Sequence, residues 1–221
     1  WKLALVMKGQ APDKLLDSYA LDRQFAADEN IMNSTRSTDF ITPKSRTSKT
    51  FRNQVLALAK HHPFARKLVN SGRLSMPSFL TQSRLNTPDA EAFEGQMVPG
   101  APMDDAPVQV NGQDAWLLDQ VGLGFACLFF AEAAPSAEVL AQLQALQTGP
   151  LPVTPLVVAP RALAVPGVKV IVDAQGWMAR RYDGKAGTTY LLRPDQHVAA
   201  RWRQLNAAQV QQAVAHATCN A

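Results

Sequence analysis

The first third of the chain carries hydrophobic residues at helical spacing. A short helix is expected over residues 1–8, ended by Gly9, and a longer one over residues 13–32, since Pro12 suits a first helical turn. One face of the longer helix carries Leu15, Tyr19, Asp22 and Ala26. A third helix is expected over residues 48–62, and its apolar face carries Phe51, Val55, Leu58 and Ala59. Pro63 ends it, and a shorter helix over residues 64–72 pairs Phe64 with Leu68.

Proline interrupts this helical pattern in the middle of the chain. Residues 74–107 hold five prolines and show no regular period. Such a stretch is typical of a linker or of a long ordered loop.

Strand patterns begin after the prolines. Asn111-Gly112 is a strong hairpin signal within residues 108–116, and residues 125–131 form a continuous apolar run typical of a buried strand. A helix capped by Ser136 turns inward the side chains of Val139, Leu140, Leu143 and Leu146. Residues 168–173 are expected to form the next strand, in a parallel βαβ arrangement.

The C-terminal elements complete a recognisable order. A short helix is expected over residues 176–182, a hairpin turns at Asp195-Gln196, and Asn206 caps a last helix. The order β-α-β-α-β-β-α is that of a thioredoxin-like fold. The predicted fold class is therefore α+β or α/β, with a central mixed sheet flanked by helices. The predicted domains are a helical part at residues 1–73, a Pro-rich linker at 74–107 and a thioredoxin-like domain at 108–221.

Composition places the chain among ordinary globular proteins. Of its 221 residues, 47% are hydrophobic and 18% are charged. No apolar run approaches the roughly 18 residues of a membrane span. The two cysteines, Cys127 and Cys219, have no metal-type spacing, which favours a reducing, cytoplasmic setting.

Basic charge is concentrated before the prolines. Residues 36–73 contain nine Lys or Arg and one acid, Asp39. Such a stretch can attract nucleic acid, but no stacking aromatic residues are interleaved with the charges, so a solvated face is favoured.

Thiol–disulfide exchange is not expected, although many proteins with a thioredoxin-like fold carry it out. The redox motif of thioredoxins lies between the first core strand and its helix, where this chain has EAAPS (residues 132–136). Cys127 lies within the strand, where a thiol is usually an inert small hydrophobe, and Cys219 lies in the tail. No proline is found at residues 187–189, before the third core strand.

Other reactive side chains form no recognisable site. His61 and His62 point to different faces of a helix, and His197 and His216 stand alone. Asp104-Asp105 has no apolar shelter, and Arg180-Arg181 can pair with Asp173 or Asp183 in a structural role. The sequence assigns no catalytic, cofactor-binding or metal-binding residue.

Three stretches resemble one enzyme family. The opening, WKLALVMKGQAPDKLLDSYALDRQ, resembles the segment that follows the flavin-binding motifs of single-component, FAD-dependent aromatic monooxygenases of the phenol and 3-(3-hydroxyphenyl)propionate hydroxylase type. The family pattern Leu-Leu-x-x-Tyr-x-x-x-Arg is matched by Leu15, Leu16, Tyr19 and Arg23. Gln24-Phe25 departs from the Arg-Pro that often follows. STRSTDFITPKS (34–45) resembles a branch of the family, and YLLRPDQHVAARW (190–202) resembles its C-terminal thioredoxin-like domain.

The resemblance implies that this chain is the C-terminal part of a flavoprotein hydroxylase and begins inside a helix. The whole enzyme would use FAD, NAD(P)H and O₂ to hydroxylate a phenolic substrate. The part present here would bind no FAD itself and would have a structural or dimerisation role. Its partners would be the N-terminal flavin domain and a second copy of the chain, with neither nucleic acid nor membrane among them.

Two other functions stay open on the sequence alone. The chain could be a stand-alone, redox-inactive thioredoxin-like interaction module. It could also bind nucleic acid through residues 36–73, in which case binding would depend steeply on salt.

Overall fold

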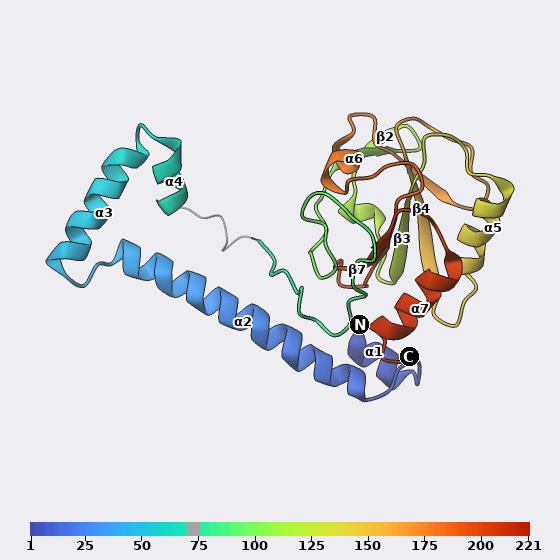
Figure 1. Ribbon diagram of the computed structural model, residues 1–221, viewed down its shortest axis with the longest axis horizontal. Helices are drawn as coiled ribbons and strands as arrows, with labels where there is room; N and C mark the ends of the chain where they lie inside the picture. Colours follow the sequence, from blue (N-terminus) through green and yellow to red (C-terminus); the bar gives the residue numbers. More distant parts are fainter. Residues whose placement is uncertain (70–75) are drawn as a thin grey trace. The chain divides into compact units, whose positions relative to one another are not determined.

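The strands and the amino-terminal helix belong to one unit of the structure. A computed structural model describes residues 1–69 and 76–221, and its contacts divide the chain into two units, residues 1–21 with 79–221 and residues 22–78 (Figure 1). We call the first the sheet unit and the second the helical unit. The domain boundaries expected at residues 73 and 107 stay predictions.

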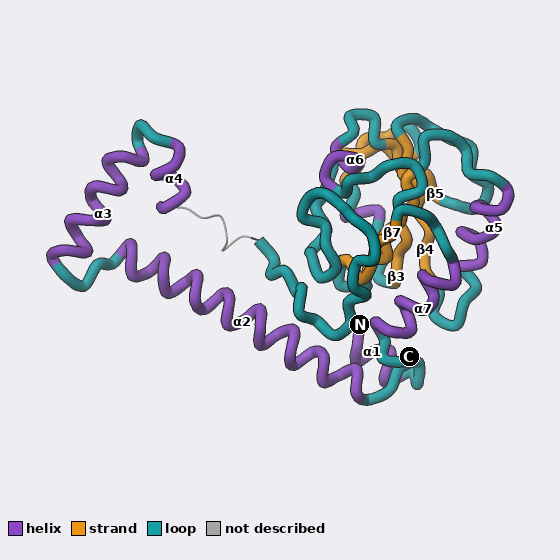
Figure 2. The backbone as a smooth tube through the Cα atoms, viewed as in Figure 1, coloured by secondary structure: helices purple, strands orange, loops and turns teal. Residues whose placement is uncertain are grey.

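A seven-stranded mixed sheet forms the centre of the sheet unit (Figure 2). Its strands are β1 (Pro107–Val110), β2 (Gln113–Trp116), β3 (Phe125–Phe130), β4 (Val153–Ala159), β5 (Lys169–Val172), β6 (Thr189–Leu192) and β7 (Val198–Trp202). They lie in the order β2-β1-β5-β4-β3-β6-β7. Strands β3, β4 and β5 are parallel, and the other pairings are antiparallel. The mixed sheet predicted from the sequence is confirmed.

The hairpin signal at Asn111-Gly112 is confirmed. β1 and β2 pair with Val110 opposite Gln113, and the two turn residues have φ values of 52° and 77°. Positive φ at both positions is what a two-residue type I′ turn requires, and Asn-Gly adopts it at low cost.

Alternate residues of β3 face two different cores, because side chains alternate across a strand. Ala126, Leu128 and Phe130 belong to a core that also contains Met178. Phe125, Cys127 and Phe129 face the opposite side. The cores there include residues from helices α5 (Ala137–Leu146) and α7 (Ala207–Ala217). The first core is covered by α6 (Trp177–Arg181), where Met178 lies, and by the loop over residues 79–106.

Strand β4 was not predicted. Residues 153–159 contain Pro155, and proline cannot donate to a sheet ladder, so the segment did not indicate a central strand. In the structure β5 pairs with β4 only from Leu156 onward, which leaves Pro155 opposite Cys127 of β3 alone. The parallel neighbour that follows α5 is therefore β4, and the expectation that residues 168–173 hold this place was wrong.

Polar side chains cap the two longer helices of the sheet unit, as predicted. The Ser136 hydroxyl accepts a hydrogen bond from the Val139 N–H, and the Asn206 side chain accepts from the amides of Ala208 and Gln209. In α5, Leu143 and Leu146 are fully buried. Each cap satisfies backbone donors that have no partner within the helix.

We expect Asn206→Ala to destabilise the sheet unit by about 1 kcal/mol, because it removes the acceptor for two orphan amides at the start of α7. Urea unfolding at neutral pH measures this loss. Asn206→Ser is the matched control, since serine retains a capping oxygen, and it should keep most of the stability. Equal losses for both variants would contradict a capping role.

The loop over residues 79–106 is ordered and packs on the sheet unit. It contains no helix or strand, but an isolated bridge joins Pro102 to His197. Asp89 forms a two-pronged ion pair with Arg201, and the Phe93 ring lies against the guanidinium groups of Arg201 and Arg203. Gly100 is required here, since its φ is +91° and an added Cβ would lie 2.3 Å from the Leu80 carbonyl oxygen. Of the two alternatives for the Pro-rich stretch, the ordered loop fits these residues.

Helices form the described part of the amino-terminal third, with boundaries that differ from expectation. They are α1 (Lys2–Met7), α2 (Lys14–Ile41), α3 (Arg46–Ala59) and α4 (Pro63–Val69). Helix α2 continues nine residues past its expected end, because no glycine or proline occurs before Pro43. The expected end of the last helix, at Gly72, lies outside the described residues.

The expected apolar stripes are only partly buried. On α2, Leu15, Asp22 and Ala26 are buried, but Tyr19 is 59% exposed and Ser18 is buried instead. On α3, Val55 is buried, whereas Phe51 and Leu58 are exposed, as are Phe64 and Leu68 on α4. Each expected stripe is therefore covered only in part within the described residues.

Candidate functional site

Residues 132–136, where a thioredoxin would carry its redox cysteines, contain no cysteine. Residues 132–136 follow β3 directly, while Cys127 lies in the middle of β3 and is completely buried. Burial raises the pKa of the Cys127 thiol to about 12. At neutral pH this group is therefore protonated, and a thiol in that state is a poor nucleophile. Cys219 is half-buried just after α7.

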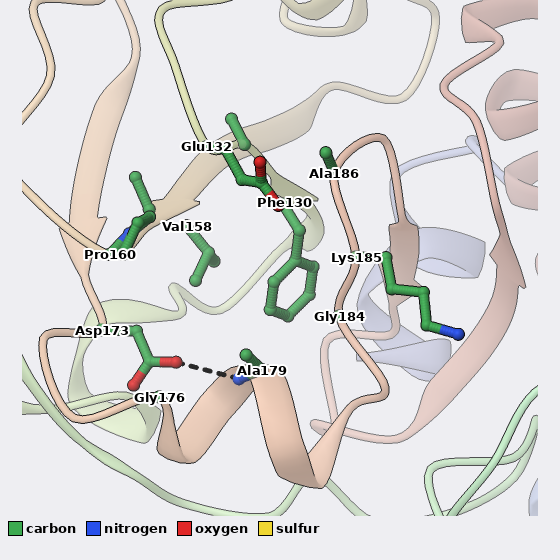
Figure 3. Close-up of a pocket in the computed structure, with 12 residues that line it drawn as sticks. Phe130, Glu132, Val158, Pro160, Asp173, Gly176, Ala179, Gly184, Lys185 and Ala186 are labelled. Carbon is green, nitrogen blue, oxygen red and sulfur yellow. Dashed lines mark hydrogen bonds between the residues drawn. The ribbon is translucent and has the colours of Figure 1, made fainter.

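A cavity of about 180 Å³ opens at the carboxyl ends of the three parallel strands (Figure 3). This end of an open parallel sheet is where ligands commonly bind. Phe130, Val158 and Pro160 supply apolar walls, and Glu132 and Lys185 supply charge. Gly184 lies so close to the Phe130 ring that an added Cβ would meet it at 2.3 Å, so a glycine is needed to form this wall.

Asp173 lies at the base of this cavity, and its carboxylate is directed toward α6 (Figure 3). Its Oδ2 accepts a hydrogen bond of 2.9 Å from the Ala179 N–H, and Asp173 is 4% exposed. The carboxylate thus caps a short helix. Histidine, cysteine and serine are not among the residues that line the cavity.

The turn between β6 and β7 brings together three charged or titratable side chains, Arg193, Asp195 and His197. This cluster was not predicted from the sequence. Arg193 is fully buried and donates to both oxygens of Asp195, with distances of 3.0 Å from Nε and 2.6 Å from Nη2. The ring Nδ1 of His197 lies 3.0 Å from the Asp195 carbonyl oxygen and 3.5 Å from its carboxylate. His197 therefore does not stand alone, because the hairpin returns it to the residue that begins the turn.

These contacts control the ionisation of Asp195. Burial by itself would raise the pKa of this carboxyl, but hydrogen bonds from His197 and Arg193 and the charge of Arg193 outweigh it. The pKa of Asp195 is held well below its ordinary range. The carboxylate stays ionised and acts as a structural anion.

The predicted ion pairs of Arg180 and Arg181 are not those of the structure. Both guanidinium groups lie over the Trp177 ring, with centroid distances of 4.7 and 5.3 Å. Asp183 pairs with Arg203 instead. The helical turn of α6 places Arg180 and Arg181 three and four residues after Trp177, on the same side of the helix, and this favours stacking.

The remaining candidate residues are apart from one another. The Asp105 carboxylate accepts from the amides of Ala106 and Leu118, and the Asp104 carbonyl accepts from the buried Tyr182 hydroxyl at 2.7 Å. Exposed positions are taken by His61, His62 and His216. Among residues 1–69 and 76–221, no three His, Cys, Asp or Glu side chains come together as metal ligands.

The helical unit carries the basic residues on its surface. Arg36, Lys44, Arg46 and Lys49 are exposed, and Lys44 lies 3.4 Å from Asp39. None of the helices in the described part of the chain has the length and apolar character needed to cross a membrane.

Known protein families provide a direct comparison for the sheet unit. A model described as the HcaD C-terminal domain matches residues 101–217. A 3-(3-hydroxy-phenyl)propionate/3-hydroxycinnamic acid hydroxylase of Mycobacterium sp. (strain JLS) is 30% identical over 208 residues, and the hydroxylase of the same name from Escherichia coli O157:H7 (strain EC4115 / EHEC) is 29% identical over 207. Each alignment covers 90% of this chain and 36% of the relative.

Solved structures share the fold at lower identity. The ternary complex of aklavinone-11 hydroxylase with FAD and aklavinone matches with a TM-score of 0.64 and 20% identity, covering 99% of this chain and 38% of the other. The rebeccamycin biosynthetic enzyme RebC with reduced flavin matches with a TM-score of 0.63 and 19% identity, covering 100% and 39%. The family model and the hydroxylase relatives confirm the resemblance drawn from the sequence, and the solved structures agree with it in fold. The chain thus spans little more than a third of the relatives it matches.

Proposed function

Because the chain belongs to the HcaD C-terminal domain family, we propose that it is the C-terminal part of a single-component, FAD-dependent monooxygenase that hydroxylates a phenolic substrate with NAD(P)H and O₂. The observation that carries this proposal is the alignment of 90% of the chain to hydroxylases of which it covers 36%. The cytoplasm, where NAD(P)H is supplied, is the proposed location.

Within that enzyme we propose a non-catalytic role for these residues. Two pockets described on the sheet unit have volumes of about 180 and 290 Å³, below the roughly 300–1,000 Å³ that is common for cofactor sites, and this supports the proposed role. Arg36, Lys44, Arg46 and Lys49 are exposed, as expected of a solvated basic surface. The chain also lacks the glycine-rich turn that lets a backbone approach a pyrophosphate.

A thioredoxin-like assignment of the sheet unit is part of the proposal. The order β5-β4-β3-β6-β7, with parallel β3–β5 followed by the antiparallel pair β6 and β7, supports it. Since Cys127 is buried and residues 132–136 contain no cysteine, this domain would serve structure and assembly without thiol chemistry.

The exposed apolar residues of the helical unit support a macromolecular partner. Phe51 is 62% exposed, and Leu58, Phe64 and Leu68 are also exposed. Side chains of this size are usually covered when several lie together. We propose the preceding flavin domain of the same longer polypeptide as the main partner, and a second copy of the chain in a homodimer as the other.

The purified 221-residue chain is expected to bind no FAD. Titration of the protein into FAD, followed by quenching of flavin fluorescence, measures this directly. Any weak association through Arg36, Lys44 or Arg46 should disappear at high salt, because exposed charges are screened. Stoichiometric binding at micromolar concentration that survives high salt would place the flavin site within these residues and contradict the proposal.

A further inference from the structure

The β6–β7 turn contacts the opposite end of the chain. The Oδ2 of Asp195 accepts a hydrogen bond of 3.0 Å from the indole Nε1 of Trp1, across 194 positions of sequence. The same oxygen receives the 2.6 Å hydrogen bond from Arg193. A carboxylate oxygen has room for both donors, and bonds to an ionised acceptor are stronger than those between neutral groups.

The indole ring is fixed by more than this one bond. It meets Phe125 of β3 edge to face, with centroids 5.8 Å apart and planes at 81°. The Arg193 guanidinium carbon lies 5.8 Å from the Trp1 ring centroid. Trp1 is therefore held by a strand, a buried cation and a carboxylate that all belong to the sheet unit.

The polypeptide that follows Trp1 is also attached to the sheet unit. Ala11 and Leu15 are buried in a core that includes Phe125. The Gln10 carbonyl oxygen accepts a hydrogen bond of 2.8 Å from the Asn220 side chain, beyond α7. The segment of residues 1–15 is thus held at Trp1 by the turn and at Gln10 by the C-terminal residues.

We propose that the Asp195 carboxylate holds Trp1 in place through the hydrogen bond from its indole N–H, a contact that we call the latch. We further propose that the latch fixes the surface against which the preceding part of a longer polypeptide packs. The inference rests on the proposed function, which supplies that preceding part. A chain spans at most about 3.5 Å per residue, so the three residues before Trp1 must stay within about 10 Å of it. Asp195 contacts Trp1 directly, and Ser83, Pro102 and His197 are joined to the same turn, so we assign the surface to these four residues.

Hydrogen bonds already connect the residues of this surface to one another, so its shape is fixed. Arg193 Nη1 lies 3.5 Å from the Ser83 hydroxyl, Pro102 bridges to His197, and the Met103 N–H donates to the Gln196 carbonyl at 2.9 Å. The 79–106 loop and the turn are therefore joined to one another at several points. The occupant we assign to it is the flavin-bearing part of the same polypeptide.

The latch itself is tested in the 221-residue chain by a double-mutant cycle of Trp1→Phe and Asp195→Ala, since alanine offers the indole no acceptor. Trp1→Phe removes the indole N–H and one ring of the indole but keeps an aromatic side chain beside Phe125, so it should retain the fold even if Asp195→Ala does not. Hydrogen exchange of the α1 amides Leu5–Lys8 should accelerate roughly ten-fold in Trp1→Phe. The double variant should exchange no faster than Asp195→Ala alone. Trp116→Phe, at an exposed tryptophan, is the control and should change nothing. Unchanged α1 exchange in Trp1→Phe, or independent additive effects, would overturn the latch.

The packing surface is tested in the longer polypeptide that the proposed function requires. Hydroxyl-radical labelling of Trp1 and His197 should fall several-fold relative to the 221-residue chain, while labelling of Trp116 stays the same. Equal labelling of Trp1 and His197 in both proteins would overturn the assignment of this surface. Bound flavin is measured on the same sample by its absorbance. A longer polypeptide without flavin would contradict the proposed function, whereas the labelling ratio decides the packing surface separately.

Discussion

Replacing Leu15 with alanine is expected to destabilise the sheet unit by about 2–5 kcal/mol, the range for truncating a fully buried leucine. Leu15 is 0% exposed and belongs to the core that contains Phe125, Val153 and Val210. Removal of the Leu15 side-chain atoms beyond Cβ would leave a cavity between α2 and the sheet, and neighbouring side chains would fill it only partly. Urea or thermal unfolding followed by circular dichroism measures the change.

Leu21→Ala is the matched control for this substitution. Leu21 lies on the same helix, receives the same change and is 49% exposed, so its loss should be well below that of Leu15→Ala. Similar losses at both positions would show that residues 1–21 do not contribute a core to the sheet unit. The same reasoning predicts that residues 79–221 alone would expose apolar surface, because their second core includes Ala11 and Leu15.

Local signals in the sequence identified most elements of the sheet unit. Asn111-Gly112, Ser136 and Asn206 act at short range, and each has the turn or cap geometry expected of it. The apolar run of β3 also behaved as expected, since burial on both faces removes the usual alternation. Strand β4 was missed because Pro155 argues against a central strand, and only the limited pairing of β5 resolves the conflict.

Contacts between distant parts of the chain could not be predicted in the same way. The stretch YLLRPDQHVAARW was singled out as a family pattern, yet nothing in it shows that Asp195 binds an indole 194 positions away. The association of residues 1–21 with the sheet has the same cause, because helical periodicity gives the apolar face of α2 and not its partner. Tyr19 is the clearest example of a residue whose burial could not be predicted from helical periodicity. It shares the expected stripe with Leu15, but the sheet unit covers only part of that stripe.

The candidate cavity was also beyond sequence reasoning. Its walls come from three strand ends, α6 and the loop at residues 184–186, which meet only in the folded sheet. A signal did exist, since Glu132 and Asp173 each follow a parallel strand at its carboxyl end. That signal could not distinguish a binding carboxylate from the helix cap that Asp173 forms.

Asp195→Asn is expected to destabilise the protein by about 3 kcal/mol at neutral pH, because it removes the carboxylate that pairs with the buried Arg193 cation. The asparagine can still accept one hydrogen bond, but it cannot neutralise a guanidinium that is shielded from water. Asp119→Asn, at an exposed carboxylate on the surface, is the control and should change stability by less than about 0.5 kcal/mol.

The pH dependence of the unfolding free energy of wild type and of Asp195→Asn distinguishes the contribution of the Asp195 charge from that of its side-chain shape. The pKa of Asp195 is lower in the folded protein than in the unfolded chain, where it is about 3.9. Its contribution is therefore fully present above the unfolded pKa and is lost as pH falls below it toward the lower folded pKa. We expect the stability difference between wild type and Asp195→Asn to shrink from about pH 4 downward. Urea unfolding at a series of pH values measures both curves. A difference that stays the same size down to pH 2 would show that Asp195 stabilises the turn without being ionised.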